Sequence, residues 1–243
     1  MRLQIEQSEV NRFGRRMARL RVESGDAEIT AASIVQLCAA KQIEMLTLRV
    51  PTDRLGLAHE LEDYGFRLMD CLVYYEAQTD TMPGGDSRSC VLREAEVADI
   101  YQVGELVRDC FADCFSHYHA DPMLDRGLVA EGYADWARRS CTNRDVAATV
   151  FLAAVGERVV GFAAMRRNSE TEGEGTLACV HPEFRGKGIY GTLVDRRLQW
   201  CSDNGMQRMI LSTQLYNVRV QRSWSTRGFR PFRSFFTFHR WFA

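Results

Sequence analysis

The sequence predicts an α/β protein in which a larger domain follows a smaller α/β domain. Strand-like and helix-like segments alternate along most of the chain, as hydrophobic periods of two and of about 3.6 residues indicate. In one stretch, an apolar run at 177–180 stops before Pro182, and a basic turn at 185–188 then leads into an amphipathic helix from Ile189. A glycine–phenylalanine turn also occurs twice, as Gly65-Phe66 and as Gly228-Phe229.

The first 77 residues are predicted to form the smaller α/β domain. Its predicted elements are a strand at 15–22, a helix at 31–42, a strand at 45–50, a helix from 51 to 64 and a strand at 66–76. In both halves of the chain a helix ends in a Gly-Phe turn that feeds an aromatic strand, so the first domain resembles the trailing half of the second. A duplicated scaffold with one ligand site explains this repeat.

A linker is predicted at 78–89, where Thr, Gly, Pro, Asp and Ser are frequent. The second domain then spans 90–243. Its predicted elements are a strand at 90–93, a helix from 96, a less regular region at 111–130, a helix at 131–141, hairpin strands at 146–155 and 158–166, a polar loop at 168–175, a strand at 177–180, a helix from 189, a strand at 209–213 and a final aromatic strand.

Composition is that of a soluble globular protein, with 46% hydrophobic and 26% charged residues. No apolar run is long enough to span a membrane, and the N-terminus is not a signal peptide. The eight cysteines contain no CxxC pair, so we expect reduced thiols in a cytoplasmic protein without structural zinc.

Charge is unevenly distributed although the net charge is only −1. Residues 94–136 hold ten acidic and two basic residues, whereas residues 185–243 hold eleven basic and two acidic residues. The basic end suits a polyanionic ligand such as coenzyme A. Nucleic acid is the rival partner, but the arginines alternate with aromatics in predicted strands and form no known nucleic-acid motif, so we expect none.

The turn after the 177–180 strand has the features of a phosphate-binding site. Gly186 and Gly188 lack a Cβ that would hold the backbone away from a diphosphate. The N–H groups at the start of the helix and its dipole favour an anion, and Arg185 and Lys187 add positive charge. The alternative is an ordinary βα turn with solvated basic residues.

The pattern Val180-x-Pro182-x-x-Arg185-Gly186-x-Gly188 resembles the acyl-CoA signature of the GNAT acetyltransferases (GCN5-related N-acetyltransferases), Arg/Gln-x-x-Gly-x-Gly/Ala. This chain departs from that signature because Tyr190 stands where the family usually has Gly or Ala.

A second motif lies downstream. The strand at 209–213 is followed by Asn217, Trp224 and Gly228-Phe229, which is close to the family's Asn…Tyr-x-x-x-Gly-Phe. The resemblance covers residues 90–243, and it implies the GNAT fold, a mixed and splayed central sheet with flanking helices.

The resemblance implies that acetyl-CoA, or another acyl-CoA, lies where two parallel strands part, with its pantetheine arm along the 177–180 strand. The implied cofactor-binding residues are Leu177, Cys179, Val180, Arg185, Gly186, Lys187, Gly188, Ile189, Tyr190, Gly191, Asn217 and Trp224. Because the family transfers the acyl group directly from CoA to an amine, Cys179 is interpreted as core packing and not as a nucleophile. Asn217 also suits a helix N-cap.

The family's usual general acid, a tyrosine, is replaced here by Trp224, whose indole cannot supply a proton at useful pH. Tyr216 is the predicted substitute, with His239 or a water molecule as alternatives.

Glu174 is the predicted base or holder of a relay water, with Glu172 and His181 as alternatives. For both carboxylates the simpler explanation is a solvated loop.

A further polar group, His117, Tyr118, His119 and Asp121, falls in the region from which the resembled family builds its acceptor pocket. Imidazole, phenol and carboxylate groups suit sugar hydroxyls and a substrate amine. A capped loop with surface histidines is the alternative. Zinc binding would need a fourth ligand that is not evident.

The overall layout resembles the dTDP-fucosamine acetyltransferases, which acetylate a nucleotide-linked amino-deoxysugar. The shared features are a truncated first domain, an Asp121-Pro122 loop before a helix with Tyr133 and Trp136, and an aromatic ending. We therefore predict an N-acyltransferase acting on such an amine. The alternatives are an acetyltransferase of another small amine, amino acid or peptide N-terminus, and a non-catalytic acyl-CoA-binding protein. A homodimer is compatible with the sequence, which does not specify the oligomeric state.

Overall fold

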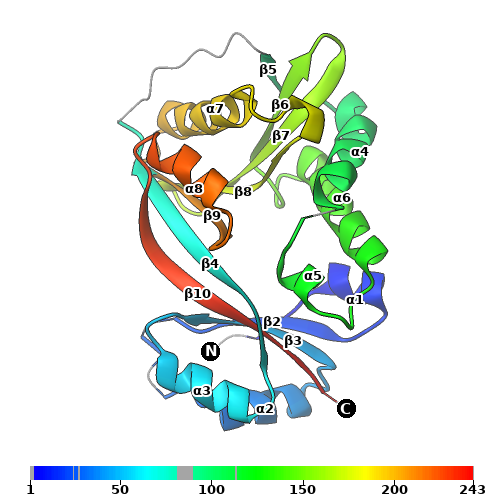
Figure 1. Cartoon of the computed structure of the whole chain (residues 1–243), viewed down its shortest axis with the longest axis vertical. Helices are drawn as coiled ribbons and strands as arrows, with labels where there is room; N and C mark the ends of the chain where they lie inside the picture. The colour runs from blue at the N-terminus through cyan, green and yellow to red at the C-terminus, as the bar shows by residue number, and fades with distance from the viewer. Residues whose placement is uncertain (1–2, 24, 27, 81–89, 113, 243) are drawn as a thin grey trace. The chain divides into compact units, whose positions relative to one another are not determined.

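A computed structural model describes the chain at residues 3–23, 25–26, 28–80, 90–112 and 114–242 (Figure 1). The chain divides into two compact units, each built from more than one segment. Unit 1 contains Met1–Val73, Phe115–Val129 and Arg233–Ala243, and unit 2 contains Tyr74–Cys114 and Ala130–Phe232. Two segments of the predicted second domain, Phe115–Val129 and Arg233–Ala243, thus belong to the same compact unit as the N-terminal residues. Most of the predicted linker, residues 81–89, lies outside the described residues.

Unit 1 contains a sheet in the order β1-β2-β3-β10-β4. The strands are β1 (Gln4–Ile5), β2 (Met17–Arg21), β3 (Met45–Pro51), β10 (Arg230–Trp241) and β4 (Arg67–Gln78), of which β4 and β10 also continue into unit 2. β2 and β3 run parallel, whereas β1 and β10 pair antiparallel to their neighbours β2 and β3.

Helices cover both faces of the unit 1 sheet (Figure 1). On one face, α2 (Ala31–Ala40) and α3 (Leu55–Asp63) bury an apolar core against β2 and β3 that includes Ile34, Leu48 and Leu61. On the other face lie α1 (Gln7–Phe13) and the short α5 (His117–Ala120).

Unit 2 contains the strand order β4-β9-β8-β7-β6-β5. Its remaining elements are β5 (Val91–Glu94), η1 (Val97–Asp99), α4 (Ile100–Phe111), α6 (Arg126–Thr142), β6 (Thr149–Val155), β7 (Arg158–Arg167), β8 (Glu172–Val180), η2 (Pro182–Phe184), α7 (Ile189–Asp203), β9 (Arg208–Gln214) and α8 (Val218–Ser225). Of these, α6 begins in unit 1 and enters unit 2 at Ala130. The sheet is antiparallel from β5 to β8 and parallel between β8 and β9.

The central strand β7 of unit 2 is covered on both faces. A Cβ on Gly161 would lie 3.0 Å from Leu193 of α7, so that helix packs closely on one face. Phe162 points to the other face, into a core shared with Val107 of α4 and Ala137 of α6. This sandwich fixes the position of β8, the strand beside β7.

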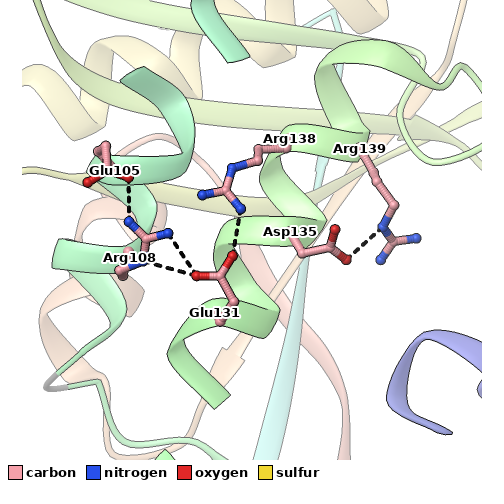
Figure 2. Close-up of polar contacts among 6 residues, drawn as sticks. All are labelled: Glu105, Arg108, Glu131, Asp135, Arg138 and Arg139. Carbon is pink, nitrogen blue, oxygen red and sulfur yellow. Dashed lines mark hydrogen bonds and ion pairs between the residues drawn. The ribbon is translucent and has the colours of Figure 1, made fainter. Parts of the chain in front are cut away.

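Ion pairs join α4 to α6 within unit 2 (Figure 2). Glu131 accepts from Arg108 at 2.8 Å and from Arg138 at 2.6 Å, and Arg108 also pairs with Glu105 on its own helix. A side chain at Gly104 would collide with the guanidinium of Arg138. The glycine therefore allows Arg138 of α6 to pack directly on the backbone of α4. Because these groups are partly exposed, each pair contributes at most about 1 kcal/mol.

Both Gly-Phe turns have the geometry that their repetition in the sequence suggests. Gly65 and Gly228 adopt left-handed conformations, with φ of 77° and 83°. In each turn the phenylalanine N–H bonds to the carbonyl five residues earlier, from Phe66 to Leu61 and from Phe229 to Trp224. Such bonds satisfy carbonyls at a helix C-terminus, and both turns then lead into a long strand.

The polar loop predicted at 168–175 is present only at 168–171, and the prediction is wrong for 172–175, because β8 already begins at Glu172. Residues 172–175 read Glu-Gly-Glu-Gly, in which glycine favours a loop in sequence-based prediction. The structure places both glycines on the buried face, where a side chain on Gly173 would collide with Cys201 and one on Gly175 with Arg197. Side chains from α7 fill that space, a tertiary effect that local sequence does not reveal.

Three further elements differ from the prediction. β1 and α1 were not predicted, and α6 begins at Arg126 instead of residue 131. Asp125 accepts from the backbone N–H of Leu128 at 2.8 Å, which caps the earlier helix start.

Candidate active site

The parallel strands β8 and β9 pair for only part of their length. Their register runs from Glu172 opposite Arg208 to Gly175 opposite Leu211. β8 then continues to Val180, still paired with β7 on its other side, and β9 continues to Gln214. In the described residues, the β8 edge from 176 to 180 therefore has no β9 partner in register.

A β-bulge marks the point where the two strands part. In the β7–β8 ladder, Met165 pairs with Gly175 and Ala164 pairs with Leu177, so Thr176 is an extra residue. Bulges bend a strand and re-aim its edge. The bulge therefore accounts for the loss of pairing on the β9 side.

Unit 1 has the same strand–helix–strand order without this opening. β2 pairs with β3 over its whole length, from Met17 to Arg21, and the N–H of Val22 extends the ladder to Arg49. The parallel pair of unit 1 thus offers no free edge at the corresponding place.

The predicted phosphate turn is exposed and adopts the glycine-dependent conformation. Gly186 and Gly188 have φ of 81° and 82°, and Gly188 is the N-cap of α7 without a side-chain cap bond. For Ile189 and Gly191, no hydrogen bond from the backbone N–H is found to any described residue. Arg185 donates from Nε to the Val180 carbonyl at 3.2 Å, which ties the turn to the strand.

An arginine that the sequence motif does not include lies beside this turn. A Cβ on Gly186 would lie 3.9 Å from the guanidinium of Arg219, in the first turn of α8. That first turn holds no acidic residue, and a cation at a helix N-terminus is unfavourable without a compensating anion. The turn therefore has a third cation next to Arg185 and Lys187.

Tyr190 and Trp224, the two departures from the family pattern, meet each other in the structure. The indole Nε1–H of Trp224 donates to Tyr190 Oη at 3.0 Å. Trp224 is 2% exposed, and its ring lies edge-on to Tyr75, with centroids 5.4 Å apart. Trp224 is thus an internal hydrogen-bond donor beneath the turn.

Asn217 and Tyr216 lie at the end of β9. Asn217 is the N-cap residue of α8, but its side chain donates to Thr213 Oγ1 at 3.0 Å and caps no N–H of the helix. Tyr216 is 53% exposed and contacts the thiol of Cys114.

The carboxylates considered as bases are engaged in ion pairs. Glu174 lies 2.5 Å from Arg166, and Glu172 lies 2.6 Å from Arg208. Both carboxylates are therefore held by arginine side chains on a strand, and not in the solvated loop considered as the alternative. The other alternative, His181, has its Nε2 atom 2.9 Å from Arg158 Nη2.

Cys179 is buried on β8, in the apolar core formed with α4 and α6. Its thiol contacts the thiol of Cys110, and this contact together with burial raises the pKa of Cys179 well above its usual range. A high pKa disfavours the nucleophilic thiolate. Leu177 packs in the same core, so the side chains of both residues point away from a ligand along the strand edge.

The predicted acceptor residues belong to unit 1, where three of them lie in internal hydrogen-bond networks. Asp121 accepts from His239 Nδ1 at 2.7 Å and from Trp241 Nε1 at 3.0 Å. These bonds lower the pKa of Asp121 although burial opposes them. His239 Nε2 in turn lies 2.8 Å from His117 Nδ1.

His117 is the last member of this series of hydrogen bonds, and its side chain is buried, at 6% exposed. Burial, followed by the charges of His239, Arg49, Arg19 and His119, holds the pKa of His117 well below its usual range. His117 and Asp121 are therefore buried groups whose hydrogen bonds join α5 and the residue after it to β10.

Tyr118 packs against His117, with ring centroids 3.9 Å apart and the ring planes tilted by 35°. Its hydroxyl bonds to Glu9 and Arg19, which also pair with each other. Glu9 is 2% exposed and its second carboxylate oxygen has no partner among the described residues. Of the four predicted acceptor residues, Tyr118 and His119 are the partly exposed ones.

Residues 101–229, more than half of the chain, match the model of the acetyltransferase (GNAT) family. The chain belongs to this family. As a GNAT enzyme it is an acyl-CoA-dependent N-acetyltransferase, and the predicted family and α/β fold are confirmed. Within the described part of the chain, no helix has both the length and the apolar character needed to cross a bilayer.

One relative of this GNAT protein is the spore coat polysaccharide biosynthesis protein SpsD of Bacillus subtilis (strain 168). The two are 26% identical over 201 residues, which cover 82% of this chain and 68% of SpsD. The crystal structure of a GCN5-related N-acetyltransferase from Sphaerobacter thermophilus has a TM-score of 0.68 at 12% identity, covering 93% of this chain and 73% of that one. A tandem GNAT protein from the clavulanic acid biosynthesis pathway has a TM-score of 0.60 at 15% identity, covering 94% and 76%.

Proposed function

We propose that this protein transfers the acetyl group of acetyl-CoA to the amine of a nucleotide-linked amino-deoxysugar. The observation that carries the donor half is the 176–180 edge of β8, which has no β9 partner in register among the described residues and is followed by an exposed turn. At that turn the N–H groups of Ile189 and Gly191 bond to none of the described residues. An extended pantetheine arm can pair with a free strand edge as a β-strand would. A diphosphate suits the turn because the helix dipole and backbone N–H groups both favour an anion.

In the proposed donor site, backbone groups and cationic side chains bind different parts of acetyl-CoA. Main-chain groups of 177–180 take the pantetheine arm, and the N–H groups of 188–191 take the diphosphate. Arg185, Lys187 and Arg219 would neutralise the remaining phosphate charge, including the 3′-phosphate of CoA.

The acceptor half of the proposal rests on a relative's name and on polar side chains in unit 1. SpsD is named for polysaccharide biosynthesis, which favours a sugar acceptor. In unit 1, Tyr118 and His119 provide partly exposed polar side chains. The Tyr118 ring lies against buried His117, and His119 Nδ1 lies 2.9 Å from the hydroxyl of buried Ser116. Polar side chains fixed by internal bonds suit recognition of sugar hydroxyls, because little ordering entropy is lost on binding.

The domain arrangement is proposed to result from duplication. The first 77 residues share a strand–helix–strand–helix–strand order with the C-terminal part of the chain, and the two Gly-Phe turns have matching geometry. A tandem GNAT protein covers 94% of this chain in structure, which supports the same interpretation.

The experiment is a thiol-release assay with acetyl-CoA and a panel of amines, preceded by calorimetric titration of the donor. The panel contains dTDP- and UDP-linked amino-deoxysugars, the free amino sugars, a polyamine, amino acids and a peptide with a free N-terminus. We expect tight acetyl-CoA binding and a kcat/KM at least 100-fold higher for a nucleotide-linked amino sugar than for the other amines. A higher kcat/KM for another amine would refute the amino-sugar acceptor and identify that amine instead. Binding of acetyl-CoA without turnover on any amine would favour a non-catalytic acyl-CoA-binding protein.

A further inference from the structure

Arg197, on α7, is a buried charge that has no carboxylate partner in the described part of the chain. The residue is 1% exposed, its Nε donates to the Leu193 carbonyl at 3.3 Å, and its Nη2 has no hydrogen-bond partner among the described residues. The groups that act on its guanidinium are Tyr190 and Cys201, neither of which is a carboxylate. Keeping an uncompensated charge in a core is costly, so this arginine requires an explanation.

The guanidinium of Arg197 lies at the point where β8 and β9 part. A side chain on Gly175 would collide with Arg197 Nη1 and with Leu211. Gly175 and Leu211 are the last registered pair of the parallel ladder. The arginine therefore packs beneath the vertex of the opening.

The vertex is also where the sulfur of the donor is expected, if the donor binds as proposed above. The open edge of β8 contains five residues, 176–180, which at about 3.3 Å per residue span roughly 16 Å. An extended pantetheine arm has a similar reach. With the diphosphate on the turn at 185–188, the thioester therefore lies near Gly175.

Tyr190 places a hydroxyl group in the same network. Its Oη accepts from Trp224 Nε1–H at 3.0 Å, and the Arg197 guanidinium approaches the same oxygen. Indole and guanidinium are donors only, so neither can accept the hydroxyl hydrogen of Tyr190. No described residue is seen to accept it. This hydrogen is thus available to an external acceptor, and two donors stabilise the oxygen once the proton has left.

We propose that Tyr190 is the general acid that protonates the departing CoA sulfur, and that Arg197 and Trp224 position it. In the step, the amine nitrogen forms a bond to the thioester carbon and the carbon–sulfur bond breaks. The electron pair of that bond stays on sulfur, which takes the proton from Tyr190 Oη. The tyrosinate, held by the two donors, then recovers the proton that the acylated nitrogen releases, so that the products are the amide and CoA thiol.

The state of Tyr190 before the reaction fits this role. Burial raises the pKa of Tyr190, more than the nearby Arg197 and Trp224 lower it. The hydroxyl is therefore protonated at neutral pH and can act as an acid. The phenol that the family pattern leads one to seek at position 224 is supplied here from α7, and Trp224 holds it. Tyr216, on the surface at the end of β9, is the rival acid.

The first test requires no acceptor, so it is independent of the proposed amino sugar. CoA is bound to the wild type, Tyr190→Phe and Tyr101→Phe, and the bound thiol is titrated by thiolate absorbance near 240 nm, with the desulfo-CoA complex as blank. Tyr101 is 75% exposed on α4 and serves as the matched control. We expect the thiol pKa to rise by at least about one unit in Tyr190→Phe only, because the thiolate loses a donor. Equal titrations in all three proteins overturn the proposal.

The second test uses the amine that the acceptor panel identifies. Tyr190→Phe should lower kcat about 100-fold, within the range for loss of a general acid, and remove the alkaline limb of the kcat profile. The Kd for acetyl-CoA should change less than threefold. Arg197→Lys should retain more of kcat than Arg197→Met. A loss of kcat in Tyr216→Phe with full activity in Tyr190→Phe overturns the proposal.

A folding control keeps the tests interpretable. If circular dichroism shows that Tyr190→Phe is unfolded, Arg197→Lys takes its place in the thiol titration, where an unchanged thiol pKa counts against the network.

Discussion

Acidification from pH 7.5 to 5.5 should destabilise unit 1 through His117. Because this buried imidazole has a pKa well below its ordinary value of 6.5, the unfolded chain binds a proton in this range that the folded chain does not. Stability therefore falls as pH drops through the unfolded pKa, and is unaffected above it. For one proton and an unfolded pKa of about 6.5, the loss between these two pH values is about 1.4 kcal/mol. Asp121, whose pKa is also lowered, loses its stabilisation only below its ordinary value of 3.8, outside this window.

The assay is urea unfolding followed by far-ultraviolet circular dichroism at the two pH values. His117→Asn keeps a donor toward His239 but cannot titrate, so its loss of stability should be smaller than that of the wild type by about 1.4 kcal/mol. His59→Asn, at an exposed position on α3, should behave as the wild type does. Equal losses in wild type and His117→Asn would refute the argument that a neutral buried His117 is required in the folded state.

Three substitutions in unit 2 test the donor site and the vertex. Gly188→Ala should weaken acetyl-CoA binding at least tenfold in calorimetry, whereas Gly205→Ala, with a similar φ of 71° at the other end of α7, should bear the same strain without that loss; equal affinities would contradict the turn assignment. Arg219→Gln should weaken CoA roughly tenfold and 3′-dephospho-CoA much less, and a uniform effect would remove it from the 3′-phosphate. Gly175→Ala should cost about 1–3 kcal/mol of unfolding free energy through collision with Arg197, whereas Gly56→Ala in α3, where a Cβ meets nothing within 4 Å, should be neutral or stabilising by up to about 1 kcal/mol; the reverse order would show that the vertex is not tightly packed.

The sequence by itself determined the fold class, the family and the glycine-dependent conformation of the turn at 185–188, because these depend on local patterns. A glycine at a position with positive φ, an apolar strand before it and a helix after it are written within a few neighbouring residues, as at Gly186 and Gly188. The same holds for the Gly-Phe turns, whose geometry needs only a helix end and a residue without a Cβ.

Tertiary structure decided what the departures from the family motif mean. Tyr190 and Trp224 are 34 residues apart. Nothing in the sequence near either residue indicates that the Tyr190 hydroxyl accepts a hydrogen bond from the Trp224 indole. The strand at Glu172 was likewise hidden, because Gly173 and Gly175 are required by the bulk of Cys201 and Arg197 on another element. The sequence suggests that His117 and Asp121 contact the acceptor substrate. In the structure both are buried and bonded to His239, which lies 118 residues beyond Asp121. Pairing across such distances depends on the packed core, and single-sequence periodicity contains no information about it.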